Sequence, residues 1–152
     1  MTAEVIQKKG YEGDIIIPET VVLKEVAYRV TSIGEEAFRY CESLTSIVIP
    51  ESVTSIGSSA FKGCSSLTSI VIGNGVTSIG YGAFLECKSL TSIVIPESVT
   101  NIGYSAFKGC KSLTSITFQG TIAQWNEIDF GNSWNDEVPI NAVHCTDGDV
   151  EI

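Results

Sequence analysis

Five cysteines and one histidine are the residues of this sequence whose side chains are best suited to chemistry. Four of the cysteines recur every 23 residues, at Cys41, Cys64, Cys87 and Cys110. The fifth, Cys145, directly follows the only histidine, His144. Thiols and imidazoles bind zinc, form disulfides and act as nucleophile and base, so three kinds of site have to be weighed.

Zinc and nucleophilic catalysis fit these residues poorly. A zinc site needs CxxC pairs or clustered histidines, and the sequence has neither. On a strand, His144 and Cys145 project to opposite sides, which disfavours a Cys/His dyad. If the periodic cysteines stack, their Cα atoms lie ~5 Å apart, within disulfide range, but parallel side chains give the wrong dihedral angle. We expect free, buried thiols, with disulfide pairing as the alternative.

Other catalytic motifs are missing as well. The many serines occur without a G-x-S-x-G motif or a second histidine for a triad. The run 73–75 (Gly-Asn-Gly) lacks the following helix of a phosphate-binding loop and predicts a tight turn. The run 147–149 (Asp-Gly-Asp) has too few ligands for calcium and predicts a solvated acidic tail. We therefore expect no enzyme activity, no cofactor and no metal.

The period that spaces the cysteines organises most of the chain. Four more residues recur with the same 23-residue step as the cysteines. Their first copies are Ile33, Gly34, Ala37 and Phe38. Three full units start at Leu44, Leu67 and Leu90, and a fourth opens at Leu113. Such self-similarity is typical of a solenoid, in which each repeat is one structural unit.

Each unit predicts the same local structure. Residues 44–49 alternate in the manner of a strand with one buried side, and Pro50 ends that strand. Residues 53–56 predict a second, shorter extended segment that Gly57 stops. The spacing within 60–64 suits one helical turn with a buried side. About eight inward positions per unit are too few for an isolated unit to fold, so the units must stack and share a core.

Both ends of such a stack need a cap. Upstream, a nine-residue insert, 22–30, interrupts the pattern. Segments 20–24 and 28–33 predict a hairpin that covers the first coil. Downstream, Thr121 is suited to cap a short helix with a buried Trp125, and residues 142–145 predict a closing strand.

Composition excludes several functions. The net charge of −9 and the pI near 4.5 disfavour nucleic acid and anionic membranes as partners. No apolar run approaches the ~18 residues of a membrane span, so no membrane insertion is expected. The first residues lack the features of a signal peptide, which leaves a cytosolic protein and a secreted one without its leader as alternatives.

The repeat unit L-x-x-I-x-I-P-x-S-V-T-x-I-G-x-x-A-F-x-x-C-x-S resembles that of the BspA-like leucine-rich repeat proteins, a bacterial group found largely on cell surfaces. The resemblance runs from Asp14 to Ser115, and residues 120–126 and 143–148 resemble the terminal segment of many members. It implies a non-catalytic solenoid that is secreted or at the cell surface and adheres to host or extracellular proteins.

The expected fold is a leucine-rich repeat solenoid, a right-handed stack of about five coils. It has a parallel sheet on one face, short helical turns on another, an N-terminal hairpin cap and a C-terminal cap. One domain, 1–152, comprises an N-terminal cap and first coil (1–43), regular repeats (44–118) and a C-terminal cap (119–152). The loop position that holds Asn or Cys in ordinary leucine-rich repeats holds Ser52, Gly75 and Ser98, so no Asn ladder is expected.

Outward-facing positions supply the candidate binding residues. On the strand they are Val48, Val71, Val94 and Thr117, and on the turn they are Tyr81 and Tyr104. Exposed valines suggest a contact site, but β-branched residues also stabilise strands laterally. The tyrosines suggest anchors for a partner, but surface drift explains them equally well. Trp125 and Trp134 are expected to fill the core of the cap rather than to form sugar or peptide platforms.

Two functions remain open at this stage. The first is an interaction module that binds an extracellular protein or glycan through its repeat faces. The second is a structural spacer, or a trimmed or engineered repeat scaffold, without its own ligand. The near identity of the units that start at Leu44 and Leu90 favours the second. The oligomeric state stays open.

Overall fold

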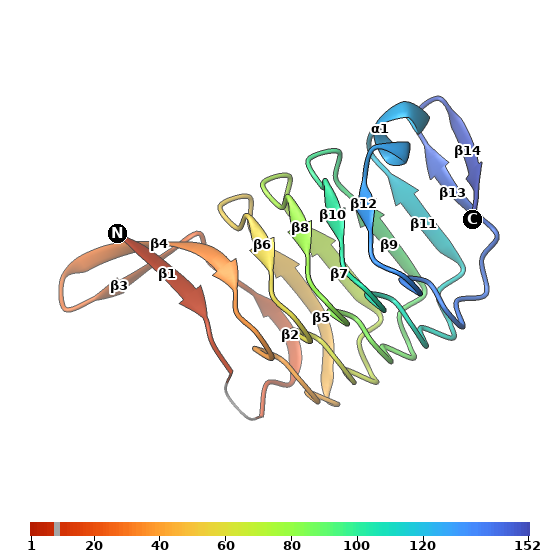
Figure 1. The fold of residues 1–152 in the computed structure, drawn as a ribbon. Coiled ribbons are helices and arrows are strands. Elements are labelled where there is room, and N and C mark those ends of the chain that lie inside the picture. Colours follow the sequence, from red (N-terminus) through yellow and green to blue (C-terminus); the bar gives the residue numbers. More distant parts are fainter. Residues whose placement is uncertain (8–9) are drawn as a thin grey trace.

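The computed structural model describes residues 1–7 and 10–152 and shows a stack of coils built on two rows of strands (Figure 1). The first row holds β2 (Gly13–Ile16), β5 (Leu44–Ile49), β7 (Ser69–Ile72), β9 (Ser92–Ile95), β11 (Ser115–Phe118) and β13 (Ala142–Cys145). The second row holds β1 (Thr2–Val5), β4 (Val26–Ile33), β6 (Ser55–Ile56), β8 (Ser78–Ile79), β10 (Asn101–Ile102) and β12 (Asp129–Phe130). Within each row, neighbouring strands other than β7 and β9 pair in parallel, which confirms the predicted solenoid.

Like residues lie over like residues through the whole core. Ile47 pairs in register with Ile70, and Ile56 with Ile79. The rings of Phe38, Phe61, Phe84 and Phe107 stack in one column with centroids 5.1, 5.3 and 5.2 Å apart. The core residues form one hydrophobic cluster, so every coil depends on its neighbours for burial. The division at residues 43/44 and 118/119 stays a prediction.

The segments that link one coil to the next are turns, and the predicted helical turn at 60–64 was wrong. Amide-to-carbonyl bonds of the i to i−3 type do occur, as from Cys64 to Phe61 at 3.1 Å. Left-handed residues interrupt them at two positions of each turn, for example Ser59 (φ 54°) and Gly63 (φ 71°). Because of this alternation, every second N–H group points along the axis of the stack. It donates a hydrogen bond to a carbonyl oxygen of the next coil instead of continuing a helix.

After the glycine that begins each turn, every second N–H of the turn donates to the next coil, always in the same direction. The N–H of Phe38 donates to the carbonyl oxygen of Ala60 at 2.7 Å, and the N–H of Phe61 donates to that of Ala83 at 2.7 Å. The same pattern continues to Phe107, whose N–H donates to the carbonyl oxygen of Trp134 at 2.7 Å. We call the outer surface of these turns (34–43, 57–66, 80–89, 103–112 and 131–140) the turn face.

The first row of strands is less regular. β2, β5 and β7 form a three-stranded sheet, and β9, β11, β13 and β14 (Gly148–Glu151) form a separate four-stranded sheet. The interruption falls between β7 and β9, immediately after the coil that carries Gly73 and Gly75 in place of proline and serine. We call the outer surface of this row the strand face.

Gly73 and Gly75 bring their coil very close to the preceding one at the corner between the rows. A Cβ atom on Gly73 would lie 2.6 Å from the carbonyl carbon of Pro50, and one on Gly75 would lie 2.0 Å from the carbonyl oxygen of Glu51. Only glycine permits this approach. The coil that contains β7 therefore lies close to the preceding coil at this corner, and β7 does not pair with β9 of the following coil.

The N-terminal hairpin is present but does not cover the first coil as expected. β3 (Thr20–Leu23) pairs antiparallel with β4, and three of its four residues are exposed, so the hairpin projects from the stack (Figure 1). The first coil is instead covered by β1, which pairs in parallel with β4, and by Tyr11, whose ring lies 4.6 Å from that of Phe38. Residues 2–5, which form β1, lie outside the 23-residue period and were not predicted as a strand.

The C-terminal end holds the expected helix and strand. Thr121 caps α1 (Ile122–Asn126) in a capping box with Gln124, and Trp125 is buried against Phe118. No helix of the described residues is long and apolar enough to cross a membrane. The predicted acidic tail at 147–149 was wrong, because these residues connect and begin a hairpin of β13 and β14. The Asp147 carboxylate accepts the N–H of Ile122 at 2.7 Å.

Candidate binding faces of the coil stack

The four periodic thiols are structural. Each of Cys64, Cys87 and Cys110 is fully buried and donates its S–H to a carbonyl of the preceding coil at 3.1 Å, for example Cys64 to Phe38. Burial raises the pKa of Cys64 and of Cys110 to about 12 and that of Cys87 well above its ordinary value. All five cysteines are free in the structure, and the periodic ones remain protonated at neutral pH.

His144 and Cys145 do not form a dyad. The Nδ1 atom of His144 lies 2.8 Å from the Asp149 carboxylate on the next strand of the hairpin, and Cys145 is half-buried. Burial, with help from Asp147 and Asp149, raises the pKa of the Cys145 thiol, which makes it a poor nucleophile. Within residues 1–7 and 10–152, no group of three or more His, Cys, Asp or Glu side chains is arranged to hold a metal ion.

The valine column lies on the strand face as predicted from the alternation. Val48 pairs with Val71, and Val94 pairs with Thr117. Val71 is 53 % exposed and Val94 44 % exposed, whereas Val48 and Thr117 are half-buried. The two most exposed valines of this column flank the interruption between β7 and β9.

Sequence analysis missed both ends of this column. Ile16 pairs with Val48 and is 77 % exposed, and His144 pairs with Thr117 at the other end. The signal for Ile16 was present, because aligning Ile15 and Ile17 with Ile47 and Ile49 places Ile16 at the valine position. His144 carries no such signal, since it lies beyond the last regular repeat.

Threonines beside the valine column already have a structural partner. The hydroxyls of Thr68 and Thr114 donate to the carbonyl oxygens of Thr45 and Thr91 at 3.2 and 3.4 Å. The same bond from Thr91 to Thr68 is not among those of the described residues, which agrees with the interruption at this point. These side chains therefore stabilise neighbouring coils and contribute little to a free surface.

The tyrosine pair lies on the turn face. The rings of Tyr81 and Tyr104 are stacked, with centroids 5.6 Å apart and planes within 4°. Tyr81 is 51 % exposed and Tyr104 is 44 % exposed, so both are available to a partner. The structure thus brings the two tyrosines together on one side of the coil stack and places the valines on a separate surface formed by the strands.

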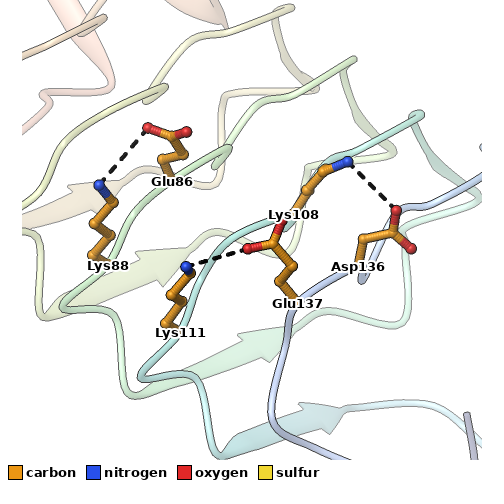
Figure 2. A network of polar contacts seen from close by, with 6 residues as sticks. All are labelled: Glu86, Lys88, Lys108, Lys111, Asp136 and Glu137. Carbon is orange, nitrogen blue, oxygen red and sulfur yellow. Dashed lines mark ion pairs between the residues drawn. The ribbon is translucent and has the colours of Figure 1, made fainter.

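Charged residues of the last three turns form ion pairs (Figure 2). The ion pairs are Lys88 with Glu86 at 4.0 Å, Lys108 with Asp136 at 3.6 Å and Lys111 with Glu137 at 3.3 Å. These side chains are more than a third exposed, so each pair contributes at most about 1 kcal/mol to stability. Their main effect is to neutralise this part of an otherwise acidic protein.

Parallel coils that share columns of leucine, isoleucine, phenylalanine and cysteine define a leucine-rich repeat protein. Residues 19–141 match six copies of the BspA-type leucine-rich repeat region. Because this match covers most of the sequence, the chain belongs to the BspA-type leucine-rich repeat family. No curated protein matches the chain.

Solved structures of bacterial leucine-rich repeat proteins have the same fold. One from Bacteroides ovatus is 28 % identical with a TM-score of 0.68, and the match covers 86 % of this chain and 39 % of that one. One from Bacteroides capillosus is 32 % identical with a TM-score of 0.61, over 70 % and 77 % of the two chains. The pneumococcal vaccine antigen PcpA is 21 % identical with a TM-score of 0.70, over 93 % and 42 %, which shows the shared fold alone. The chain thus spans about two-fifths of the Bacteroides ovatus protein.

Proposed function

We propose that this chain is a non-catalytic interaction module of a cell-surface or secreted bacterial protein. Its ligand would be an extracellular protein or glycan, bound through the outer faces of the coils. Membership of the BspA-type family supports the location and the absence of catalysis. Burial of the periodic thiols, the groups best suited to chemistry, also argues against an enzyme.

The observation that carries the proposal is the exposure of apolar and aromatic side chains that the core does not use. Val71 and Val94 on the strand face, and Tyr81 and Tyr104 on the turn face, are each about half exposed. They lie on rigid strands and turns, which lowers the entropy that a partner must overcome on binding. Large exposed side chains of these types are typical of interaction surfaces.

A structural spacer without its own ligand is the second candidate. The unit that starts at Leu90 differs from the one that starts at Leu44 at three positions, 101, 104 and 111. Stacking of the repeats alone explains such similar sequences, because every coil needs the same inward residues whether or not a ligand binds. Tyr104 is one of the three differences, however, and its stacking on Tyr81 is more than a spacer needs.

The two candidates separate in a binding screen. The immobilised chain is exposed to extracellular matrix proteins and to a glycan array, and binding is measured for the parent, Val71→Lys and Tyr81→Ser. Loss in Val71→Lys alone places the site on the strand face, and loss in Tyr81→Ser alone places it on the turn face. Each variant is the control for the other, because they alter different surfaces. Binding to neither panel would favour the spacer.

A further inference from the structure

The outward column that contains the tyrosine pair changes character along the stack. From one coil to the next, its members are Glu35, Ser58, Tyr81, Tyr104 and Asn132. Backbone bonds fix this order, since the N–H of Ser59 donates to the carbonyl oxygen of Tyr81 at 2.7 Å. The N–H of Gly82 likewise donates to the carbonyl oxygen of Tyr104 at 2.9 Å. Two aromatic side chains therefore lie between short or charged polar ones.

The tyrosine stack is open at its end over the coil of Ser58. Tyr104 covers one ring face of Tyr81, with the planes 4° apart. The opposite face of Tyr81 looks toward the coil of Ser58, whose hydroxymethyl group is too short to cover a ring. In the core, by contrast, Phe61 and Phe84 each have an aromatic neighbour on both sides.

The space between the open face of Tyr81 and the next residue of the column, Glu35, is the space at the level of the Ser58 coil. Stacked aromatic rings in successive coils of this protein have centroids 5.1 to 5.6 Å apart, so one more ring of similar thickness would extend the tyrosine stack by one coil. A pyranose is such a ring, because its axial C–H bonds form a flat, weakly positive face that packs on the negative face of an aromatic ring.

The polar groups around this space favour a sugar over an apolar side chain. Ser58 offers a hydroxyl at the same level, and Glu35 offers an exposed carboxylate one coil further on. Lys62 belongs to the same turn as Ser58 and is half-buried. An apolar partner would take these groups from water without replacing their hydrogen bonds, whereas sugar hydroxyls both donate and accept.

We propose that the Tyr81–Tyr104 stack is a glycan subsite that takes one pyranose ring against the open face of Tyr81, over Ser58. The inference rests on the proposed function, since it names the ligand class of one of the two candidate faces. It differs from that proposal in a testable way, because a protein ligand on the strand face would satisfy the proposed function alone.

The test is a titration of the protein, labelled with ¹³C in its tyrosine rings, with three probes. They are the methyl β-glycosides of glucose, galactose and N-acetylglucosamine, each added to roughly 100 mM, where even a Kd near 10 mM gives near-saturation. We expect at least one probe to shift the ring signals of Tyr81 and Tyr104 and to show upfield-shifted axial protons of its own. Tyr40 is also exposed but lies over Gly63, and its signals should stay in place.

Two variants copy residues that neighbouring coils already carry, so the fold should be retained. Tyr81→Ser places at this position the residue of the preceding coil, and it should weaken binding at least tenfold. Ser58→Tyr fills the proposed space with a third stacked ring and should also weaken binding at least tenfold, although it adds aromatic surface. Val22→Lys, on the exposed N-terminal hairpin and outside both candidate faces, should leave the affinity for the probes unchanged.

The outcomes decide between the two proposals. If no probe shifts the Tyr81 ring, or if binding survives in Ser58→Tyr, the glycan subsite is wrong. Binding of a matrix protein that Val71→Lys abolishes would then still support the proposed function. Stronger binding in Ser58→Tyr would point to an aromatic or apolar ligand and would equally overturn the pyranose assignment.

Discussion

The strand face and the turn face are built from the same 23-residue unit, yet they differ in continuity. Beneath the turn face, contacts between aromatic rings run from Tyr11 through the buried phenylalanine column to Trp134. On the strand face, pairing is interrupted between β7 and β9. Buried rings and one-directional hydrogen bonds therefore hold the coils together, whereas the strands tolerate a break where one coil carries Gly-Asn-Gly. The next four predictions test this difference.

The largest effect is expected for Phe84→Ala. Phe84 is fully buried between Phe61 and Phe107, so its loss should lower the free energy of unfolding by about 3 to 5 kcal/mol. Denaturant unfolding measures the change. Tyr81→Ser is the control, because a side chain that is 51 % exposed should cost no more than about 1 kcal/mol. Equal losses in the two variants would mean that the continuous core column does not hold the stack together.

Gly75→Ser is expected to have the next largest effect. Equivalent positions in neighbouring coils are serines, but here a Cβ atom would lie 2.0 Å from the carbonyl oxygen of Glu51. We expect a loss of about 1 to 3 kcal/mol in denaturant unfolding, as for other overpacked sites. Gly82→Ser is the matched control, since Ser59 and Ser105 adopt its left-handed conformation and its Cβ atom would meet nothing closer than 3.5 Å. If Gly75→Ser left the free energy of unfolding unchanged, the close approach of Gly75 to Glu51 would not explain the missing pairing between β7 and β9.

The thiol column predicts a loss of stability at high pH. The pKa of Cys64 is raised from 9.0 to about 12 in the folded protein, mainly because burial disfavours the thiolate. Above pH 9 the unfolded chain loses this proton and the folded chain keeps it. The stabilisation is therefore complete below pH 9 and is lost as the pH rises toward 12. The expected loss is about 1 kcal/mol per pH unit for this thiol.

Urea unfolding between pH 8 and 10.5 measures this slope. Cys64→Ala should be less stable than the parent at pH 8 but should lose stability more slowly as the pH rises. Cys145→Ala is the control, since Cys145 is only half-buried and should change the slope less. Identical slopes for all three proteins would show that folding does not raise the pKa of the Cys64 thiol.

The smallest effect is expected for Val71→Lys. Val71 is 53 % exposed beside the interruption, so the change should alter the free energy of unfolding by no more than about 0.5 kcal/mol. Thermal melting measures it, with Val48→Lys as a comparison because Val48 is half-buried between two paired strands. A loss well above 1 kcal/mol for Val71→Lys would mean that the valines serve lateral packing rather than a partner.

The sequence was sufficient to predict the stack because its period is preserved at every inward position. A repeated Phe38, Ala37 or Ile33 position has one simple explanation, in which equal residues lie above one another in a shared core. The strand alternation likewise placed Val71 outward, since side chains on a strand alternate between two sides. The Tyr81 and Tyr104 positions followed from the same register.

Other features left a weaker signal. The turn at Gly131 repeats the contacts of earlier turns, with its N–H on the carbonyl oxygen of Ile102 at 2.7 Å. The insertion of α1 places it 28 rather than 23 residues after Gly103, which hides the repeat. The left-handed turns were missed because Ser59 and Glu86 occupy conformations that glycine usually marks, although glycine alternates with these types at the same positions.

The hydrogen bonds of the turn face also give the molecule an electrical polarity. Because the inter-coil N–H groups inside each turn, such as those of Phe38 and Phe61, point toward the C-terminal end, their peptide dipoles add along the stack as they do in a helix. The first turn presents the negative ends of these dipoles and carries three glutamates, Glu35, Glu36 and Glu42, beside Arg39. The last turn presents their positive ends and carries Asp136 and Glu137. The carboxylates of the last turn therefore oppose a field that grows with every coil added, whereas those of the first turn reinforce it.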